Sequence, residues 1–212
     1  MIISINKNNR PKRPKNIPIK RTEKYYCGTF NNDKFFCSKK DLYNKINYIK
    51  MDLKTCKKNL LTFDYLMSFF KIPFYIIYGT LLGAVREKNF IAYDNDTDIA
   101  ILNGEINNLN ILLKSKKFTN SGFEVCRTFS DLVTITRDGE VIDIYVFRNK
   151  NEKYYCQKGA SNSDPLNFFD NPSTISFLGK NFQTVQNPEK YFLLHYGKDW
   201  KTPKRGWNTH AH

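Results

Sequence analysis

Residues 78–99, YGTLLGAVREKNFIAYDNDTDI, join a Gly-Thr pair, a short helical segment and three alternating aspartates. The pair Gly79-Thr80 follows the aromatic and β-branched run 74–78, which predicts a buried strand. Free backbone N–H groups at the start of a helix attract phosphate oxygens. The pair is therefore a candidate phosphate site, and Arg86, one to two turns into the helix, is a candidate for a second phosphate.

The run DNDTD at 94–98 places carboxylates at Asp94, Asp96 and Asp98. In an extended chain a spacing of two residues puts all three on one face. Like charges this close repel one another unless a cation lies among them or water surrounds them. An acidic surface loop also fits this run. A calcium-binding EF-hand does not, because its sixth position needs glycine and the chain has Ile99 there.

Asp143 interrupts the apolar run 141–147, which reads VIDIYVF and predicts a buried strand. An unpaired ionised carboxylate buried in such a strand costs several kcal/mol. One solution is an ion pair with a lysine or arginine. The other is a strand beside Asp96 and Asp98, so that three carboxylates share one divalent ion. Mg²⁺ or Mn²⁺ suits this all-oxygen ligand set.

Apolar residues recur in steps of three and four from Leu42 to Phe70. This period predicts one long helix that packs on a sheet through a single stripe. Ser38 with Asp41 resembles a capping box at its start, and Pro73 prevents its continuation. The e and g positions carry no organised charges, so a coiled coil is not expected.

Further elements follow downstream. The run 97–102 predicts a strand, and 105–116 predicts a helix. Two strands, 132–136 and 141–147, are joined through Asp-Gly at 138–139, a favoured centre for a tight hairpin turn. A short helix is expected over 188–196, with Gly197 as its stop. The chain therefore belongs to the α+β class, with one mixed sheet and packed helices.

The chain has 212 residues, of which 41 % are hydrophobic, and a formal charge of +14. We expect a flexible basic arm over 1–24 and a single domain over 25–212. Nucleic acid, a membrane surface or phosphorylated substrates would each suit this charge. The Lys- and Asn-rich composition is also typical of an AT-rich genome, which would need no anionic partner.

The five cysteines form no CxxC pair, so reduced and packed thiols are expected; a zinc site using Cys27 and Cys37 stays open. The first 21 residues lack the apolar segment of a signal peptide. The N-x-S/T pattern at Asn95 lies within the acidic run, where a glycan would block a metal site. A cytoplasmic location is therefore expected.

The combination of GTLLGAVR at 79–86 with DNDTDI at 94–99 resembles the signature of the LicD / fukutin-related family. Later segments are similar as well: VIDI at 141–144, FLG at 177–179, and YGKDW at 196–200 before a proline. The family usually has Pro-Trp immediately before its acidic run, where this chain has Ala-Tyr at 92–93. All three alternating aspartates are kept, so the departure bears on the choice of acceptor rather than on the metal.

The resemblance implies a nucleotidyltransferase-like, polymerase-β-like fold. It also implies transfer of a phospho-alcohol, such as phosphocholine or ribitol phosphate, from a CDP-activated donor to a sugar hydroxyl on a glycan or glycolipid. Asp96 and Asp98 would hold Mg²⁺ or Mn²⁺ on the donor diphosphate. Asp143 would complete the metal site and accept the proton of the attacking hydroxyl.

The same resemblance assigns phosphate oxygens of the donor to Gly79, Thr80 and Arg86, with Asp94 as a further substrate-binding residue. The basic arm could contact a membrane surface that carries the acceptor.

Other activities are compatible with the sequence. A nucleotidyltransferase would use an NTP and release pyrophosphate, and a DxD glycosyltransferase would also use a metal-bound nucleotide donor. A catalytically silent nucleic-acid-binding protein is the alternative from a different class, but no recognised nucleic-acid motif accompanies the charge. His195 is either a base near the site or a packed helix residue, and the packed role is favoured.

Overall fold

The structure is a computed structural model that describes residues 24–38, 51–150, 153–156, 163–165 and 167–204. The expected basic arm, apart from Lys24, lies outside the described residues, as do Asp41 of the proposed capping box and the part of the predicted long helix up to residue 50. The division into an arm and a single domain stays a prediction.

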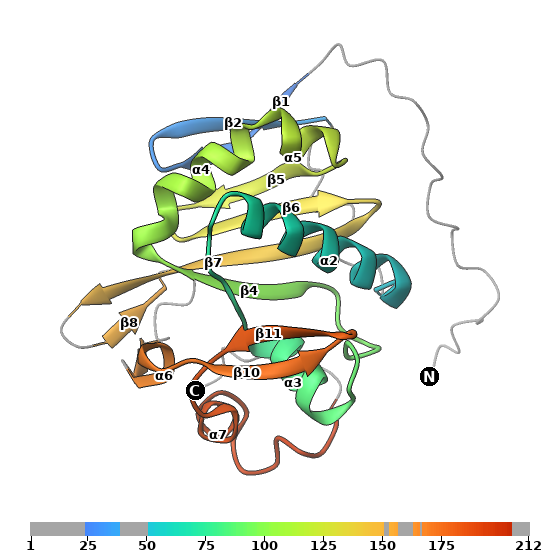
Figure 1. Ribbon diagram of the computed structural model, residues 1–212, viewed down its shortest axis with the longest axis vertical. Helices are drawn as coiled ribbons and strands as arrows, with labels where there is room; N and C mark the ends of the chain where they lie inside the picture. The colour runs from blue at the N-terminus through green and yellow to red at the C-terminus, as the bar shows by residue number, and fades with distance from the viewer. Residues whose placement is uncertain (1–23, 39–50, 151–152, 157–162, 166, 205–212) are drawn as a thin grey trace, which may run out of the picture.

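The described residues form both helices and strands (Figure 1). The helices are α2 (Leu53–Phe69), α3 (Tyr78–Arg86), α4 (Ile106–Lys114), α5 (Lys116–Asn120), α6 (Asn167–Asp170) and α7 (Pro188–Tyr196), with a 3-10 helix over Asn103–Glu105. The strands are β1 (Tyr25–Phe30), β2 (Asp33–Cys37), β3 (Tyr75–Ile76), β4 (Thr97–Leu102), β5 (Glu124–Phe129), β6 (Leu132–Arg137), β7 (Glu140–Lys150), β8 (Lys153–Tyr155), β9 (Ser163–Pro165), β10 (Ser173–Phe177) and β11 (Lys180–Thr184).

One mixed sheet organises the molecule. Its main strands lie in the order β10-β11-β3-β4-β7-β6-β5, while β8 pairs with β7 and β9 pairs with β8. The pairs β11–β3 and β4–β7 are parallel, and the other neighbouring pairs are antiparallel. The predicted α+β class with a mixed sheet is confirmed.

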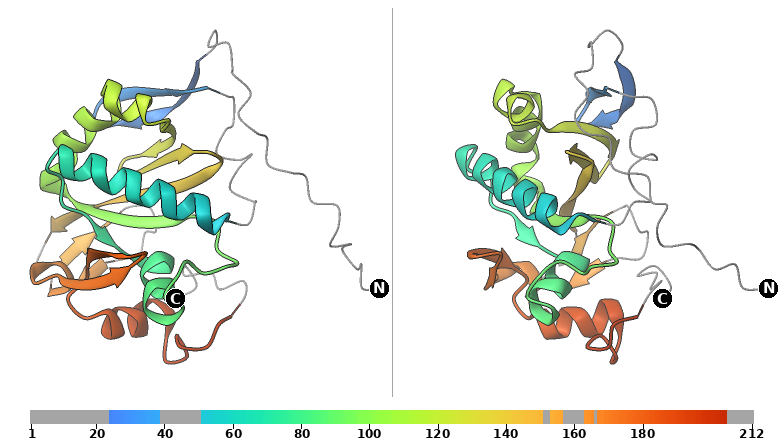
Figure 2. Two further views of the ribbon diagram at one scale, coloured as in Figure 1. Left: turned by 45° about the vertical axis from the view of Figure 1, so that its right-hand side comes forward. Right: turned by 90° about the vertical axis from the view of Figure 1, so that its right-hand side faces the viewer.

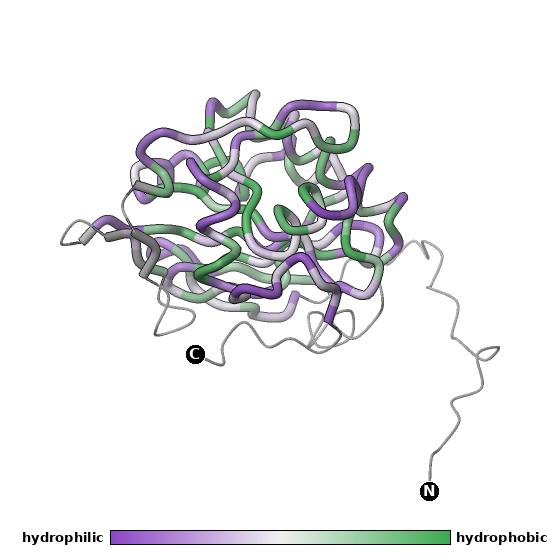
Figure 3. Tube along the Cα trace, turned by 90° about the horizontal axis from the view of Figure 1, so that it is seen from below, coloured by the Kyte–Doolittle hydropathy of each residue, from purple (hydrophilic) through white to green (hydrophobic). Residues whose placement is uncertain are grey.

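Helices α2, α4 and α5 lie together on one side of the sheet (Figure 2). On α2 the apolar side chains of Cys56, Leu60, Phe63 and Met67 recur in steps of four and three, and all four are buried. This period turns one stripe of the helix toward the sheet. Hydrophobic stretches alternate with hydrophilic ones along the coloured part of the trace (Figure 3), as expected for elements buried on one side.

The prediction of one continuous helix from Ser38 is wrong. Helix α2 begins only at Leu53, after Asp52 in an extended conformation with φ −88° and ψ 100°. The backbone N–H groups just before the helix donate elsewhere: that of Met51 to the carbonyl oxygen of Asp94, and that of Asp52 to Oε1 of Glu140. These tertiary bonds hold the chain extended where the apolar period continues.

Two other predicted elements differ from those observed. The expected strand over 74–78 is only Tyr75–Ile76, because Tyr78 has a positive φ of 44° and already begins α3. The helix predicted over 105–116 is divided into α4 and α5 at Ser115. Its extended backbone ends one helix, and its Oγ accepts a hydrogen bond from the N–H of Phe118 in the next.

Several local predictions are confirmed. Asp138 and Gly139, between β6 and β7, both have positive φ, 52° and 81°, as a tight hairpin requires. Helix α7 covers the predicted residues, and Gly197 ends it with φ 75°. None of the described helices is both long and apolar enough to cross a membrane.

The hairpin of β1 and β2 was not predicted. It packs against β5, the last strand at its edge of the main sheet. Ser38 fixes its end by donating from its N–H and Oγ to the two carboxylate oxygens of Glu124, each at 2.9 Å. Gly28, with φ 131°, lies so close to Thr128 that a Cβ would meet its carbonyl oxygen at 2.8 Å. The hairpin therefore docks through a position that requires glycine.

Gly28→Ala is expected to loosen this docking by about 2 kcal/mol, because the new Cβ collides with Thr128 and alanine is strained at this φ. Hydrogen exchange of the β1 and β2 amides measures the effect. The matched control is Gly104→Ala, where an added Cβ has no atom within 4 Å. Unchanged protection of the hairpin in the Gly28 variant would contradict the docking.

Candidate active site

The parallel pairing of β4 with β7 brings two predicted metal ligands together. In its register Asp98 lies directly opposite Asp143. Paired residues of neighbouring strands project to the same face of a sheet. Alternation along β7 sends Ile142 and Ile144 to the opposite face, where they belong to the main apolar core. Both carboxylates are nearly inaccessible, with Asp98 6 % and Asp143 1 % exposed.

The Gly-Thr pair at the start of α3 holds Asp98 in place. The N–H of Gly79 donates to Oδ2 of Asp98 at 3.1 Å, and Oγ1 of Thr80 accepts from the N–H of Asp98 at 2.8 Å. A Cβ on Gly79 would lie 2.4 Å from Oδ2 of Asp94 and 3.3 Å from Oδ2 of Asp98. A side chain at position 79 would therefore displace the Asp94 carboxylate.

The site concentrates negative charge. Burial is the main cause that raises the pKa of the Asp98 carboxyl well above its usual range, and three neighbouring carboxylates raise it further. In order of effect these neighbours are Asp96, Asp94 and Asp143. Burial also raises the pKa of Asp94. An arrangement that disfavours its own ionisation is one that a bound cation would stabilise.

The partly buried Tyr145 and the buried Tyr196 border the carboxylates. Burial raises the pKa of Tyr145 and of Tyr196 well above the usual range, and Asp98 is the next largest cause for both. Tyr145 lies on β7 two residues after Asp143, on the same face, and Tyr196 ends helix α7. Both stay neutral donors beside the acidic site. The period of two along β7 could have identified Tyr145, whereas Tyr196 reaches the site only through tertiary packing.

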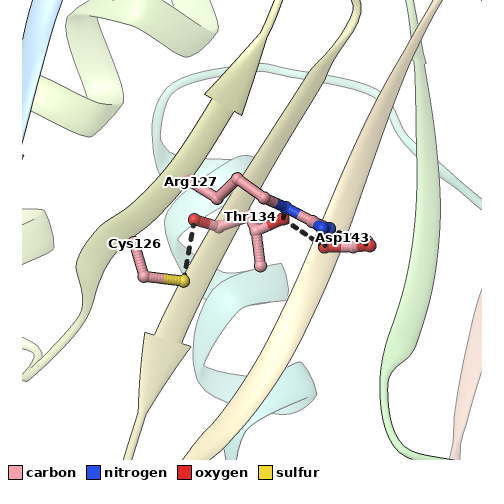
Figure 4. A network of polar contacts seen from close by, with 4 residues as sticks. All are labelled: Cys126, Arg127, Thr134 and Asp143. Carbon is pink, nitrogen blue, oxygen red and sulfur yellow. Dashed lines mark hydrogen bonds and ion pairs between the residues drawn. The ribbon is translucent and has the colours of Figure 1, made fainter. Parts of the chain in front are cut away.

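Asp143 forms an ion pair with Arg127, a partner that the sequence analysis did not identify. NH2 of Arg127, on β5, lies 3.1 Å from Oδ2 and 3.4 Å from Oδ1 of Asp143, and Thr134 of β6 donates to Oδ1 (Figure 4). The sequence left two explanations for this buried carboxylate: an ion pair with a basic residue, or a strand position beside the other aspartates. The structure contains both the ion pair and the position beside Asp98. The two are compatible because Asp143 has one neighbour strand on each side.

Among the residues that the structure describes, no three carboxylate, thiol or imidazole groups are already arranged to hold a metal ion. Both oxygens of Asp143 are in use by Arg127 and Thr134. The donor chemistry still fits a hard divalent cation, because the groups gathered around Asp98 are carboxylates. Asp96, Asp98 and Asp143 as metal ligands therefore stay a prediction that requires Asp143 to share an oxygen.

Arg86 lies at the end of α3 and is nearly buried. Its guanidinium donates to Oε1 of Glu87 at 2.7 Å, to the hydroxyl of Tyr93 at 3.2 Å and to the carbonyl oxygen of Trp200 at 3.2 Å. Its Nε is buried without a hydrogen-bond partner. The structure thus ties Arg86 to the C-terminal segment, and its binding of a phosphate stays a prediction.

His195 of α7 packs between rings. Its centroid is 4.2 Å from that of Tyr191 and 5.2 Å from that of Tyr78. This agrees with the favoured role of a packed helix residue.

All five cysteines are free, and three of them gather where the β1–β2 hairpin meets the sheet. Cys37 and Cys126 are buried beside Val141, with Cys27 packed against them. Burial, with Cys37 as a further cause, raises the pKa of the Cys27 thiol to about 12. The predicted reduced and packed thiols agree with this arrangement.

Two substitutions of the carboxylates should shift stability in opposite directions in the absence of metal. Asp98→Asn keeps an acceptor for Gly79 but removes a buried charge, so it should stabilise the protein by about 1 kcal/mol, or about 2–4 °C in Tm. Asp143→Asn leaves the Arg127 guanidinium without its anion and should destabilise the protein by about 1–3 kcal/mol. Calorimetry in EDTA measures both changes.

The pH dependence follows from the raised pKa of Asp98. The folded state binds this proton more tightly than the unfolded chain, so stability from this group is lost as pH rises from the unfolded pKa through the folded one. The metal-free protein should therefore gain stability from pH 8 to about pH 5, with a smaller gain in Asp98→Asn. Changes in Tm of the same sign for Asp98→Asn and Asp143→Asn, or stability of the metal-free protein that does not rise toward pH 5, would contradict this view of the site.

Comparisons with known proteins support the fold and the family. Structures of ANT(2″)-Ia are similar in fold: a crystal structure in complex with adenylyl-2″-tobramycin has a TM-score of 0.51 and 14 % identity, covering 73 % of this chain and 82 % of that one. A solution structure of ANT(2″)-Ia has a TM-score of 0.51 and 13 % identity, covering 74 % and 80 %. At such identities the likeness supports the fold alone.

A lincomycin-bound crystal structure of the lincosamide antibiotic adenylyltransferase LnuA matches with a TM-score of 0.48 and 13 % identity, over 66 % of this chain and 85 % of that one. No curated protein sequence matches the chain. The predicted nucleotidyltransferase-like fold is confirmed by the ANT(2″)-Ia structures together with the mixed sheet.

Residues 71–187, more than half of the chain, match the family described as LicD/FKTN/FKRP, nucleotidyltransferase domain. The match contains the Gly-Thr pair, the alternating aspartates and Asp143, and it leaves the β1–β2 hairpin and all of α2 outside. By its signature residues and by this match, the chain belongs to the LicD/FKTN/FKRP nucleotidyltransferase-domain family.

Proposed function

We propose that this protein transfers a phospho-alcohol, such as phosphocholine or ribitol phosphate, from a CDP-activated donor to a sugar hydroxyl on a glycan or glycolipid. The observation that carries the proposal is the pairing of Asp98 with Asp143 on adjacent parallel strands, at a site crowded with carboxylates. Family membership gives the reaction class, a transferase, and the donor and acceptor are our proposal.

Asp96, Asp98 and Asp143 would hold Mg²⁺ or Mn²⁺, which would neutralise charge on the donor diphosphate. The ligand set is supported by the proximity of these groups: the carboxylates of Asp96 and Asp143 are both among the causes of the raised pKa of Asp98. Their mutual repulsion favours a cation at this position.

In the transfer, the acceptor oxygen bonds to the phosphorus of the phospho-alcohol while the bond from that phosphorus to the bridging oxygen breaks, and CMP leaves. We assign the proton of the attacking hydroxyl to a carboxylate oxygen of Asp143. Thr134 donates a hydrogen bond that fixes the orientation of that carboxylate. Positioning and charge neutralisation, rather than covalent catalysis, would supply most of the rate enhancement.

The other predicted substrate residues have distinct roles in this proposal. Gly79 and Thr80 orient Asp98 through the two hydrogen bonds described above, and they lie where the donor phosphates would approach the start of α3. Asp94 lies against Gly79 at the same edge. Arg86 would offer its buried Nε to the donor after a small rearrangement.

The cytoplasm is the compartment that we propose, because a glycan at Asn95 would lie inside the acidic run. Nucleic acid is not proposed as a partner. The role of the basic arm at a membrane surface stays a prediction.

The test is an incubation of the protein with Mg²⁺ or Mn²⁺ and a panel of CDP-alcohols and NTPs, assayed for CMP and for pyrophosphate. We expect metal-dependent CMP release from one CDP-alcohol. Asp96→Ala and Asp98→Asn should lower it by about 10²-fold or more, since both remove charge from the site.

Asp138→Asn is the matched control. It also removes one carboxylate, but in the β6–β7 turn at a positive φ that asparagine tolerates, so CMP release should be unchanged. Pyrophosphate release from an NTP would replace the proposal with nucleotidyl transfer. Absence of any metal-dependent turnover or nucleotide binding would exclude both reactions.

A further inference from the structure

Four side chains form a row across the sheet that ends at the proposed metal site. Arg127 of β5 pairs with Thr134 of β6, Thr134 pairs with Asp143 of β7, and Asp143 pairs with Asp98 of β4. Figure 4 shows the Arg127 side chain extending across β6 to Asp143. Its Nε lies 3.1 Å from Oγ1 of Thr134. A cation of the protein therefore occupies one side of Asp143, and the acidic cluster occupies the other.

A β-bulge puts Arg127 in this row. The register of β5 with β6 shifts between Val125 and Arg127. Val125 pairs with Ile135, so a regular ladder would place Cys126 opposite Thr134. The extra residue advances the strand by one position, and the thiol of Cys126 instead donates to the carbonyl oxygen of Thr134 at 3.4 Å. Bulges beside active sites commonly redirect one side chain.

Arg127 and a divalent ion would compete for Asp143. The two carboxylate oxygens already accept hydrogen bonds from Arg127 and Thr134. A metal shared with Asp98 needs one of these oxygens, and it would add two positive charges close to the guanidinium. At this small separation and low exposure, like charges repel strongly. Either the guanidinium leaves Asp143 or the metal binds weakly.

We propose that Arg127 is a positioning residue that acts as the counter-ion of Asp143 in the metal-free enzyme and makes metal binding depend on the nucleotide donor. The metal alone binds weakly, because it must displace the guanidinium. A donor diphosphate brings negative charge to the same place and gives the displaced guanidinium a new partner. The Arg127 side chain is 17 % exposed, so part of it can be reached from solvent.

This role has a thermodynamic consequence. If the diphosphate favours displacement of Arg127, it raises the affinity for the metal, and the metal raises the affinity for the diphosphate by the same factor. The proposal rests on the proposed function for the identity of the diphosphate, but the competition between Arg127 and the metal does not depend on it.

The experiment titrates Mn²⁺, followed by electron paramagnetic resonance, without and with saturating CDP as the diphosphate probe. In the wild-type protein CDP should tighten Mn²⁺ binding. In Arg127→Gln, Mn²⁺ alone should bind about 5- to 150-fold more tightly than in the wild type, and CDP should add little. Arg127→Lys keeps the charge without the two-pronged contact, and it should keep part of the coupling.

Arg148→Gln is the matched control. Arg148 also pairs with a buried carboxylate, that of Asp131, at 2.6 Å, but away from the acidic cluster. Its substitution should lower Tm without changing Mn²⁺ affinity or the effect of CDP. If Arg127→Gln does not fold, Arg127→Lys is used for the test, because loss of the two-pronged contact with Asp143 should still reduce the effect of CDP on Mn²⁺ binding.

The outcomes separate this inference from the proposed function. Equal or weaker Mn²⁺ binding in folded Arg127→Gln would overturn the role of Arg127 and leave the metal site intact. Absence of Mn²⁺ binding from both the wild type and Arg127→Gln would overturn the metal site, and with it the proposed function. Tighter Mn²⁺ binding in Arg127→Gln with no effect of CDP on the wild type would refute the coupling to the donor.

Discussion

The parallel ladder between β4 and β7 is the constraint on which the site depends. The two strands are separated in sequence by α4, α5 and the strands β5 and β6, and the ladder brings Asp98 opposite Asp143. Alternation then sends their apolar neighbours Ile99 and Ile144 to the core, where both are fully buried. The same register that completes the core therefore concentrates carboxylates on the other face, and a shift by one residue would exchange the two.

The surrounding residues make this concentration of charge tolerable. On one side, the first turn of α3 gives Asp98 a backbone N–H from Gly79 and an accepting hydroxyl from Thr80. On the other, the bulge in β5 supplies Arg127 to Asp143. Each aspartate thus has its own hydrogen-bond or ion-pair partners, but these do not remove the electrostatic repulsion between the two carboxylates. We propose that a site held in this state binds a cation and an anionic substrate together.

Much of the site was predictable because its signals are local. The alternating aspartates and the apolar strand around Asp143 indicated the candidate site, in which Asp98 and Asp143 lie on adjacent strands, and Asp138-Gly139 indicated the hairpin that returns β7 beside β6. Family resemblance supplied the fold and reaction class. The sequence did not show that Arg127 would be the ion-pair partner of Asp143. The position of Arg127 depends on a bulge, and nothing in the sequence around Cys126 marks the register at which β5 pairs.

The unpredicted parts of the fold have the same cause. The β1–β2 hairpin lacks a strong alternating pattern, and its docking depends on Gly28 meeting Thr128, a contact between residues a hundred positions apart. The apolar period that continues upstream of Leu53 indicated a longer helix. The backbone N–H groups of Met51 and Asp52 donate to distant residues instead, so the helix begins only at Leu53. Tertiary hydrogen bonds can override local propensity in this way, and sequence periodicity does not report them.

The most direct test of the account is the position of a bound metal. We would grow crystals of the protein with Mn²⁺ and CDP and locate the ion by its anomalous scattering. The account predicts one strong peak about 2.1 Å from oxygens of Asp98 and Asp143, with Asp96 as a third ligand and Arg127 turned away from Asp143. A peak elsewhere, or an ion held only by Asp94 and Asp96 while Arg127 keeps Asp143, would contradict it.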